Sequence, residues 1–138
     1  ILVIGYLLFA RGSYMAKSEF ENLQVYQLAE ELSDRIWNIV AAWDSFAKNT
    51  VGQQLVRAVD SIGANIAEGN GRRDTRDNRR FVRIAWGSLN ETQHFLRRAY
   101  KRKLIKKEEA ELLSPIIEAL GPKLNAYHRS LTPQDEKL

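Results

Sequence analysis

A glutamate and a histidine stand three residues apart in the stretch Glu91-Thr92-Gln93-His94, a spacing that can place both side chains on one helical face. Di-metal carboxylate sites in four-helix bundles use two such motifs and two further glutamates that project inward. This chain has only one, because its other histidine, His128, follows Asn125 at the corresponding spacing. We therefore predict no metal site and no cofactor.

A serine nucleophile requires a general base beside it. Ser61 and Ser88 both fall inside predicted helices, and the pattern assigns a histidine to neither of them. The chain has no cysteine, which excludes thiolate chemistry and disulfides and is typical of a cytoplasmic protein. We accordingly predict that the protein is not an enzyme.

Positive charge is concentrated in one stretch of the chain. Residues 72–107 hold thirteen Lys or Arg against three carboxylates, a local charge of +10, whereas the whole chain carries +4. Helical spacing predicts one outer face of cations with a tryptophan, extended at both ends: Arg72, Arg73, Arg76, Arg79, Arg83, Trp86, Arg97, Lys101 and Arg102. Guanidinium groups bind phosphate in a forked geometry, and an indole can stack on an unpaired base. We predict that this face binds RNA or DNA.

Other interpretations of the same residues remain open. The positive face could be a solvated surface balanced by acidic helices nearby, or it could dock an acidic protein. Trp86 could lie in an oligomer interface, where tryptophan is enriched. Salt-sensitive binding to generic RNA would favour nucleic acid over a protein-interaction scaffold.

A second set of small and polar residues follows the predicted contact between the two central helices. Its members are Ser61, Gly63, Asn65, Glu68, Gly69, Ser88 and Glu91. Buried polar groups must be hydrogen-bonded, so we favour a role in cross-linking helices or subunits over ligand binding. Gly63 should also let a neighbouring helix approach closely.

Apolar periodicity predicts four helical segments that position these residues. The first covers Phe20 to Asp44 with Ser18 as its N-cap, and Ser45 to Val51 connects it to the next. The second begins near Gln53 and ends at Gly69-Asn70-Gly71, where we expect the left-handed conformation that closes a helix.

The third segment begins at Asp74 or Thr75 and ends near Arg98. The fourth covers Glu108 to Leu131, and we expect a kink or a break at Pro115 and Gly121-Pro122, since proline removes a backbone donor. Four helices with short connections predict an all-α, up-down-up-down four-helix bundle.

The 138 residues are enough for one domain, which we place at 15–131, followed by a polar tail at 132–138. Residues 1–14 begin with the apolar run ILVIGYLLFA, which is too short for a membrane span of about twenty residues. We interpret this leader as upstream translation or an added segment, and expect it to be dispensable. The alternative is a native apolar arm that packs on a partner. No membrane association is predicted.

The segments QLVRAVDSIGANIAEGNGRR and RRFVRIAWGSLNET resemble the signature of the bacterial 23S rRNA intervening sequence protein family. The matching residues are Gln54, Leu55, Arg57, Ala58, Ser61, Ile62, Asn65, Ile66, Glu68, Gly69, Arg80, Phe81, Ile84, Ala85, Gly87, Ser88 and Glu91. The resemblance implies a four-helix bundle assembled as a homopentamer. It extends to the accessory variability determinant protein of diversity-generating retroelements, which implies RNA and a reverse transcriptase as partners.

Overall fold

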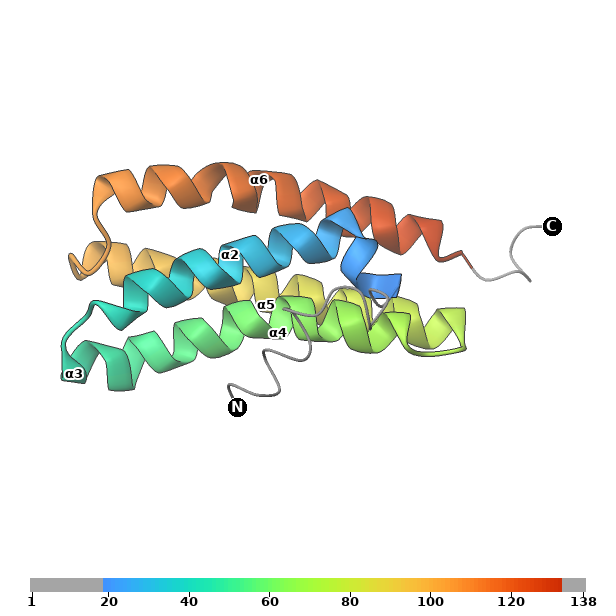
Figure 1. The fold of residues 1–138 in the computed structure, drawn as a ribbon, viewed down its shortest axis with the longest axis horizontal. Coiled ribbons are helices and arrows are strands. Elements are labelled where there is room, and N and C mark those ends of the chain that lie inside the picture. Colours follow the sequence, from blue (N-terminus) through green and yellow to red (C-terminus); the bar gives the residue numbers. More distant parts are fainter. Residues whose placement is uncertain (1–18, 133–138) are drawn as a thin grey trace, which may run out of the picture.

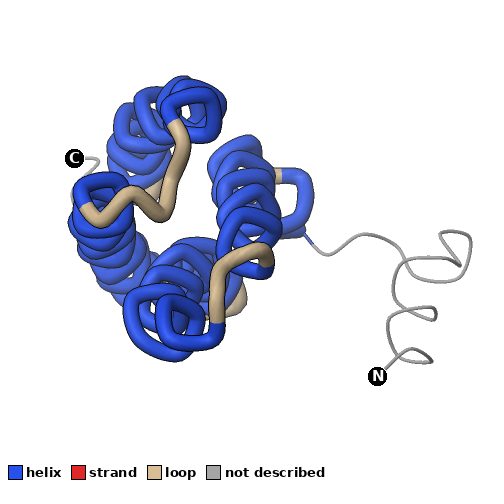
Figure 2. Tube along the Cα trace, turned by 90° about the vertical axis from the view of Figure 1, so that its left-hand side faces the viewer, coloured by secondary structure: helices blue, strands red, loops and turns tan. Residues whose placement is uncertain are grey.

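The computed structural model of this chain describes residues 19–132. Within that range it is all-helical, with four long helices: α2 (Gln24–Ala41), α4 (Gln53–Asn70), α5 (Thr75–Lys101) and α6 (Lys107–Ser130). They lie alongside one another in Figure 1, and Figure 2 shows them end-on around a shared centre. The all-α prediction is confirmed. The leader, Ser18 and the tail beyond Thr132 lie outside the described residues.

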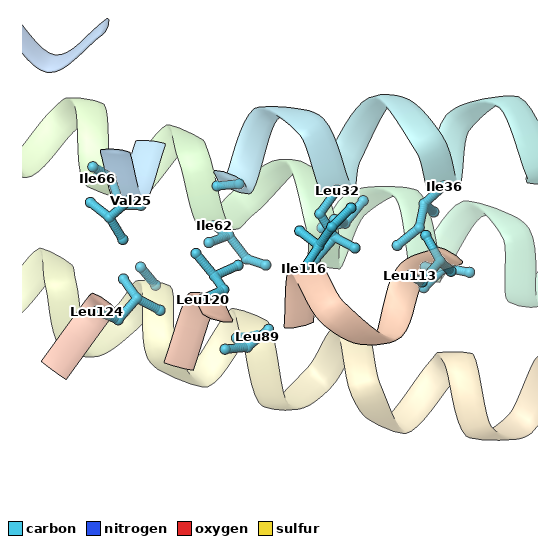
Figure 3. Close-up of a cluster of buried hydrophobic side chains, with 14 of the residues drawn as sticks. Val25, Leu32, Ile36, Ile62, Ile66, Leu89, Leu113, Ile116, Leu120 and Leu124 are labelled. Carbon is cyan, nitrogen blue, oxygen red and sulfur yellow. The ribbon is translucent and has the colours of Figure 1, made fainter. Parts of the chain in front are cut away.

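One apolar core holds the four helices together. Figure 3 shows its side chains pointing toward one another from α2, α4, α5 and α6. The largest fully buried apolar side chains are Leu32, Ile36, Leu55, Val59, Ile62, Ile66, Val82, Leu89, Leu120 and Leu124. Burying one leucine or isoleucine stabilises the fold by about 1.5–3 kcal/mol. The extent of this core explains how long helices with exposed charged faces remain folded.

The first helix begins later than predicted. A short 3-10 helix, η2 (Glu19–Asn22), precedes α2, and Leu23 at the N-cap makes no side-chain capping hydrogen bond. The Leu23 amide donates to the Phe20 carbonyl at 3.1 Å, and the Phe20 ring packs edge-on against Tyr26 with centroids 4.9 Å apart. The contact between Phe20 and Tyr26 therefore favours a 3-10 turn before α2, where helix periodicity predicted the first turn of the α-helix.

The predicted connection over residues 45–51 is itself helical. Asp44 Oδ1 accepts a hydrogen bond from the Ala47 amide at 2.9 Å, which caps α3 (Ser45–Ala47). A π-helical turn, η3 (Lys48–Gly52), then runs directly into α4. Gly52 fits here because an added Cβ would lie 2.9 Å from Val40 Cγ1. The predicted connection is therefore a helical segment, stabilised by the Asp44 cap and by the close approach of Gly52 to Val40.

The end of α4 also differs from prediction. Gly71 has φ −74°, and no glycine in residues 19–132 has a positive φ, so the predicted left-handed closure is wrong. The Gly71 amide instead donates to the carbonyls of Ala67 at 3.1 Å and Glu68 at 3.2 Å. Lys103, in the α5–α6 connection, adopts the left-handed conformation with φ 62°.

Helix α5 starts where the sequence places it. Asp74 is its N-cap, and Asp74 Oδ1 accepts a hydrogen bond from the Arg76 amide at 2.8 Å. Its buried residues are Asn78, Phe81, Val82, Ala85, Ser88, Leu89, Thr92 and Ala99. Helices α4 and α5 make the most extensive contact of any helix pair in residues 19–132. The hairpin that they form is therefore the main packing unit, against which α2 and α6 lie.

Helix α6 runs without a break through both prolines (Figure 1). Of the two outcomes that we predicted, a kink or a break, the break is therefore wrong. Pro115 and Pro122 are both exposed and stand seven residues apart, on the solvent side of the helix. Carbonyl groups that lack a partner because of a proline can there bond to water, and long helices commonly bend with this side convex. The prolines therefore interrupt two hydrogen bonds without ending the helix.

Candidate nucleic-acid interface

Ser61, Asn65 and Ser88 form a polar link between α4 and α5. The hydroxyl oxygens of Ser61 and Ser88 lie 3.1 Å apart. The Asn65 amide donates to the Ser61 carbonyl at 2.7 Å and to its hydroxyl at 2.9 Å. The Ser88 hydroxyl also lies 3.1 Å from the Ile84 carbonyl. The partners of both hydroxyls are thus groups of α4 and α5 rather than a histidine, and the arrangement fits helix cross-linking.

The two glycines that we predicted at the contact between the central helices, Gly63 and Gly69, differ in their surroundings. A Cβ on Gly69 would lie 2.6 Å from Asn78 Oδ1 and 2.8 Å from Phe81 Cβ, so only glycine fits against α5 there. A Cβ on Gly63 would meet the Tyr26 ring at 3.5 Å, an ordinary contact, and on α2 rather than α5. Close approach of the central helices therefore depends on Gly69.

The two glutamates that we predicted at the same contact do not take part in the link formed by Ser61, Asn65 and Ser88. Glu68 and Glu91 are both exposed. Glu68 accepts a hydrogen bond from Arg72 Nη2 at 2.8 Å, so it belongs to the charged surface at the α4–α5 turn. Glu91 and His94 are exposed on α5, and residues 19–132 hold no group of three or more potential metal ligands.

At the α4–α5 turn, two arginines lie over one aromatic ring. The guanidinium carbons of Arg72 and Arg80 lie 4.9 Å and 4.7 Å from the centre of the Phe81 ring. Asp77 joins them, with Oδ1 2.9 Å from Arg80 Nη2 and Oδ2 3.6 Å from Arg72 Nε. Arg80 was absent from the predicted positive face. Contacts with Phe81 and Asp77 orient both cations, although exposed ion pairs of this kind add only about 0–1 kcal/mol of stability.

Further along α5, three cations face solvent without a partner. Arg83, Arg97 and Lys101 are exposed, and none forms an ion pair or side-chain hydrogen bond within the described part of the chain. Arg73 and Arg102 are exposed at the two ends of the helix. We call Arg83, Arg97 and Lys101 the open cations of α5.

Arg79 and Trp86 depart from their predicted place on an outer face. Both are half-buried, and Trp86 packs against the apolar core. Its Cη2 atom lies 3.7 Å from the position that a Cβ on Gly121 of α6 would occupy. The sequence could not show this, because the contact joins residues far apart in the chain. At this end, the positive face lies along the border of α5 and α6.

That border contains a groove of about 250 Å³, lined by Val82, Arg83, Trp86, Leu124, Asn125 and His128. Burial lowers the pKa of His128, and the positive charges of Arg79 and Arg83 lower it further. Sequence spacing considered His128 only as a second metal ligand and rejected it, because Asn125 stands at the position of the required glutamate. Its position opposite Arg83, on α6, is what brings it to the positive face.

Residues 19–132 thus define an all-α protein with four long helices around one apolar core. The sequence model of the 23S rRNA-intervening sequence protein family matches residues 21–126, so the chain belongs to that family. Among the helices of residues 19–132, none combines the length and the hydropathy of a membrane-spanning segment.

The chain is also similar to a solved structure, that of a Bacteroides thetaiotaomicron VPI-5482 protein of unknown function from the S23 ribosomal protein family. The TM-score is 0.65 at 25% sequence identity, and the match covers 75% of this chain and 96% of that one. No curated protein matches this sequence.

Proposed function

We propose that this protein binds RNA or DNA through phosphate groups, on the positive face of α5, and acts without catalysis. The observation that carries the proposal is the set of open cations: Arg83, Arg97 and Lys101 are exposed and have no ion-pair partner in residues 19–132. A cation already neutralised by a neighbouring carboxylate gains little from a phosphate. Open cations can instead displace the counterions condensed on a nucleic acid, which drives binding.

The remaining predicted residues extend this face. Arg73 and Arg102 are exposed at its ends, while Arg72 is held over Phe81. The local charge of +10 over residues 72–107 would steer a polyanion toward the helix. None of these features distinguishes one base from another, so the proposed binding has little sequence preference.

We further propose an up-down-up-down bundle that assembles in the cytoplasm as a homopentamer, in keeping with the family resemblance. Trp37 and Phe46 support self-association, because 60% and 81% of their surfaces are exposed. Trp37 also lines a groove of about 380 Å³ between α2 and α4, together with Val40 and Val56. Exposed aromatics beside an apolar groove are typical of a contact surface. The retroelement resemblance adds a reverse transcriptase as a proposed partner.

Fluorescence anisotropy of labelled single-stranded RNA, measured across a salt series, tests the nucleic-acid proposal. We expect binding at low salt, with log affinity falling linearly as log salt concentration rises. An absence of binding at the lowest salt, for both RNA and DNA, would contradict it. The positive face would then be assigned to docking of an acidic protein.

A further inference from the structure

The groove between α5 and α6 concentrates positive charge beside an aromatic ring. Arg83 enters it from α5, and His128 and Asn125 enter it from α6. Arg79 stands close enough to His128 to lower its pKa. The residues that line the groove include no carboxylate, which distinguishes it from the Asp77 cluster at the α4–α5 turn.

His128 is the unusual member of this set. Its Nε2 atom is buried and has no hydrogen-bond partner among residues 19–132. A buried polar atom without a hydrogen-bond partner is energetically unfavourable, and in a native protein it is commonly satisfied by a water, an ion or a ligand. An oxyanion would supply the acceptor that this nitrogen lacks.

We propose that the α5–α6 groove is a phosphate-binding site in which His128 binds as the imidazolium, with Arg83 and Asn125 as further donors. This assignment rests on the proposed function for the source of the phosphate, a backbone phosphate of the bound strand. Arginine, an amide and a protonated histidine are all hydrogen-bond donors to phosphate oxygens. Trp86 lines the groove and offers apolar surface to the attached sugar or base.

Binding at this site takes up a proton. In the free protein, the charged groups that face His128 are Arg79 and Arg83 on α5, and both disfavour the imidazolium. Helix α2 also packs on α6, but it contributes no residue to the groove lining. A phosphate replaces this repulsion with attraction and favours the imidazolium. Affinity should therefore rise as pH falls through the range in which the free histidine is neutral.

Anisotropy of a labelled single-stranded RNA at fixed low salt, at about pH 5.5 and about pH 8, measures this linkage. For the unmodified protein we expect affinity to fall on raising the pH, by up to about tenfold for each unit by which the phosphate raises the pKa of His128. His128→Gln should lose most of this dependence and bind more weakly at low pH. His94→Gln tests the other histidine: His94 is exposed on α5 three residues before Arg97 and does not line the groove, so most of the pH dependence should survive its substitution even if overall affinity changes.

A titration with sulfate, followed by NMR signals of the two histidine rings, separates this site from the wider proposal. Sulfate is a tetrahedral dianion that does not titrate in this pH range, and chloride at equal ionic strength is its control. We expect sulfate to move the His128 signals in a saturable way, to raise the pKa of that ring, and to leave His94 unchanged.

The two experiments distinguish failure of the site from failure of the proposed function. RNA binding whose pH dependence survives in His128→Gln would overturn the groove assignment and leave the proposed function standing. If RNA does not bind but sulfate raises the pKa of His128, the phosphate site stands and the proposed function falls. A His128 ring that responds to neither anion overturns the site.

Discussion

Gly69 has less room for a side chain than the other glycines in the described range. A Cβ at this position would lie 2.6 Å from Asn78 Oδ1 and 2.8 Å from Phe81 Cβ. Both neighbours are buried on α5 and cannot move away freely. At the scale of single residues, this glycine sets the distance between α4 and α5 and so the position of the arginines that follow.

Replacement of Gly69 by alanine should destabilise the protein by about 1–3 kcal/mol, because the methyl group overpacks the contact with α5. Urea unfolding measures the change in stability. Gly87→Ala is the matched control, since no atom lies within 4 Å of a Cβ there and the residue is exposed on α5. It should stabilise the helix by up to about 1 kcal/mol. Equal effects of the two substitutions would contradict this role of Gly69.

His128 predicts a dependence of stability on pH. Its pKa is lowered in the folded protein, so the unfolded chain binds more protons when pH drops below the ordinary histidine range. The contribution of neutral His128 to the free energy of unfolding should therefore be fully present above about pH 6.5 and should be lost as the pH falls toward the lowered pKa. His128→Gln should flatten this part of the curve, and His94→Gln should not. A curve unchanged by His128→Gln would show that another group is responsible.

The chemistry of these residues could be anticipated only in part. The exposed row of Arg83, Arg97 and Lys101 and the contact of Ser61 with Ser88 followed from helical spacing, because each set lies on one or two neighbouring helices. His128 and Trp86 could not be placed in this way. Their surroundings depend on how α6 rotates against α5, which no spacing within either helix determines.

At the scale of the elements, the start of α5 is the boundary that the sequence located best. Asp74 is a capping residue, and its carboxylate accepts the Arg76 amide at 2.8 Å. Residues 45–52 and α6 were harder to predict. A helical connection through a π turn depends on the close contact of Gly52 with Val40, and an unbroken α6 depends on both prolines facing solvent.

Removal of the Asp74 cap should destabilise the protein by about 0.5–2 kcal/mol, because a backbone donor of α5 is left without its acceptor. Thermal unfolding of Asp74→Ala measures this effect. Asp74→Asn is the control, since it removes the same charge but keeps a side-chain oxygen for the cap. If the two variants are destabilised equally, charge rather than capping explains the role of Asp74.

At the scale of the whole molecule, self-association is expected to use the surface around Trp37 and Phe46. Light scattering should give a mass close to five times the 15.9 kDa protomer. The double substitution Trp37→Glu and Phe46→Glu should shift the protein to smaller species, because buried charges would be unpaired. Leu112→Glu, at another exposed apolar residue, is the control for added charge. A monomer in the unmodified protein would rule out the assembly.

The central claim about function is that the cations concentrated on α5, rather than the net charge of the chain, bind nucleic acid. The chain carries only +4, yet residues 72–107 carry +10 and present Arg83, Arg97 and Lys101 without ion-pair partners within residues 19–132. Arg79 is a poorer choice for substitution, because it is half-buried beside His128 and makes other interactions. A decisive test should therefore remove the three open cations and leave Arg79 in place.

The measurement is RNA affinity across a salt series for the Arg83→Gln, Arg97→Gln, Lys101→Gln triple variant. Its matched control is Arg35→Gln, Lys123→Gln, Arg129→Gln, which removes the same charge from exposed residues of α2 and α6 that line neither the α5–α6 groove nor the groove beside Trp37. The slope of log affinity against log salt should shrink by about 0.7–0.9 for each phosphate that the first variant no longer neutralises, and should change little in the second. Equal slopes in the two variants would contradict the assignment of nucleic-acid binding to α5.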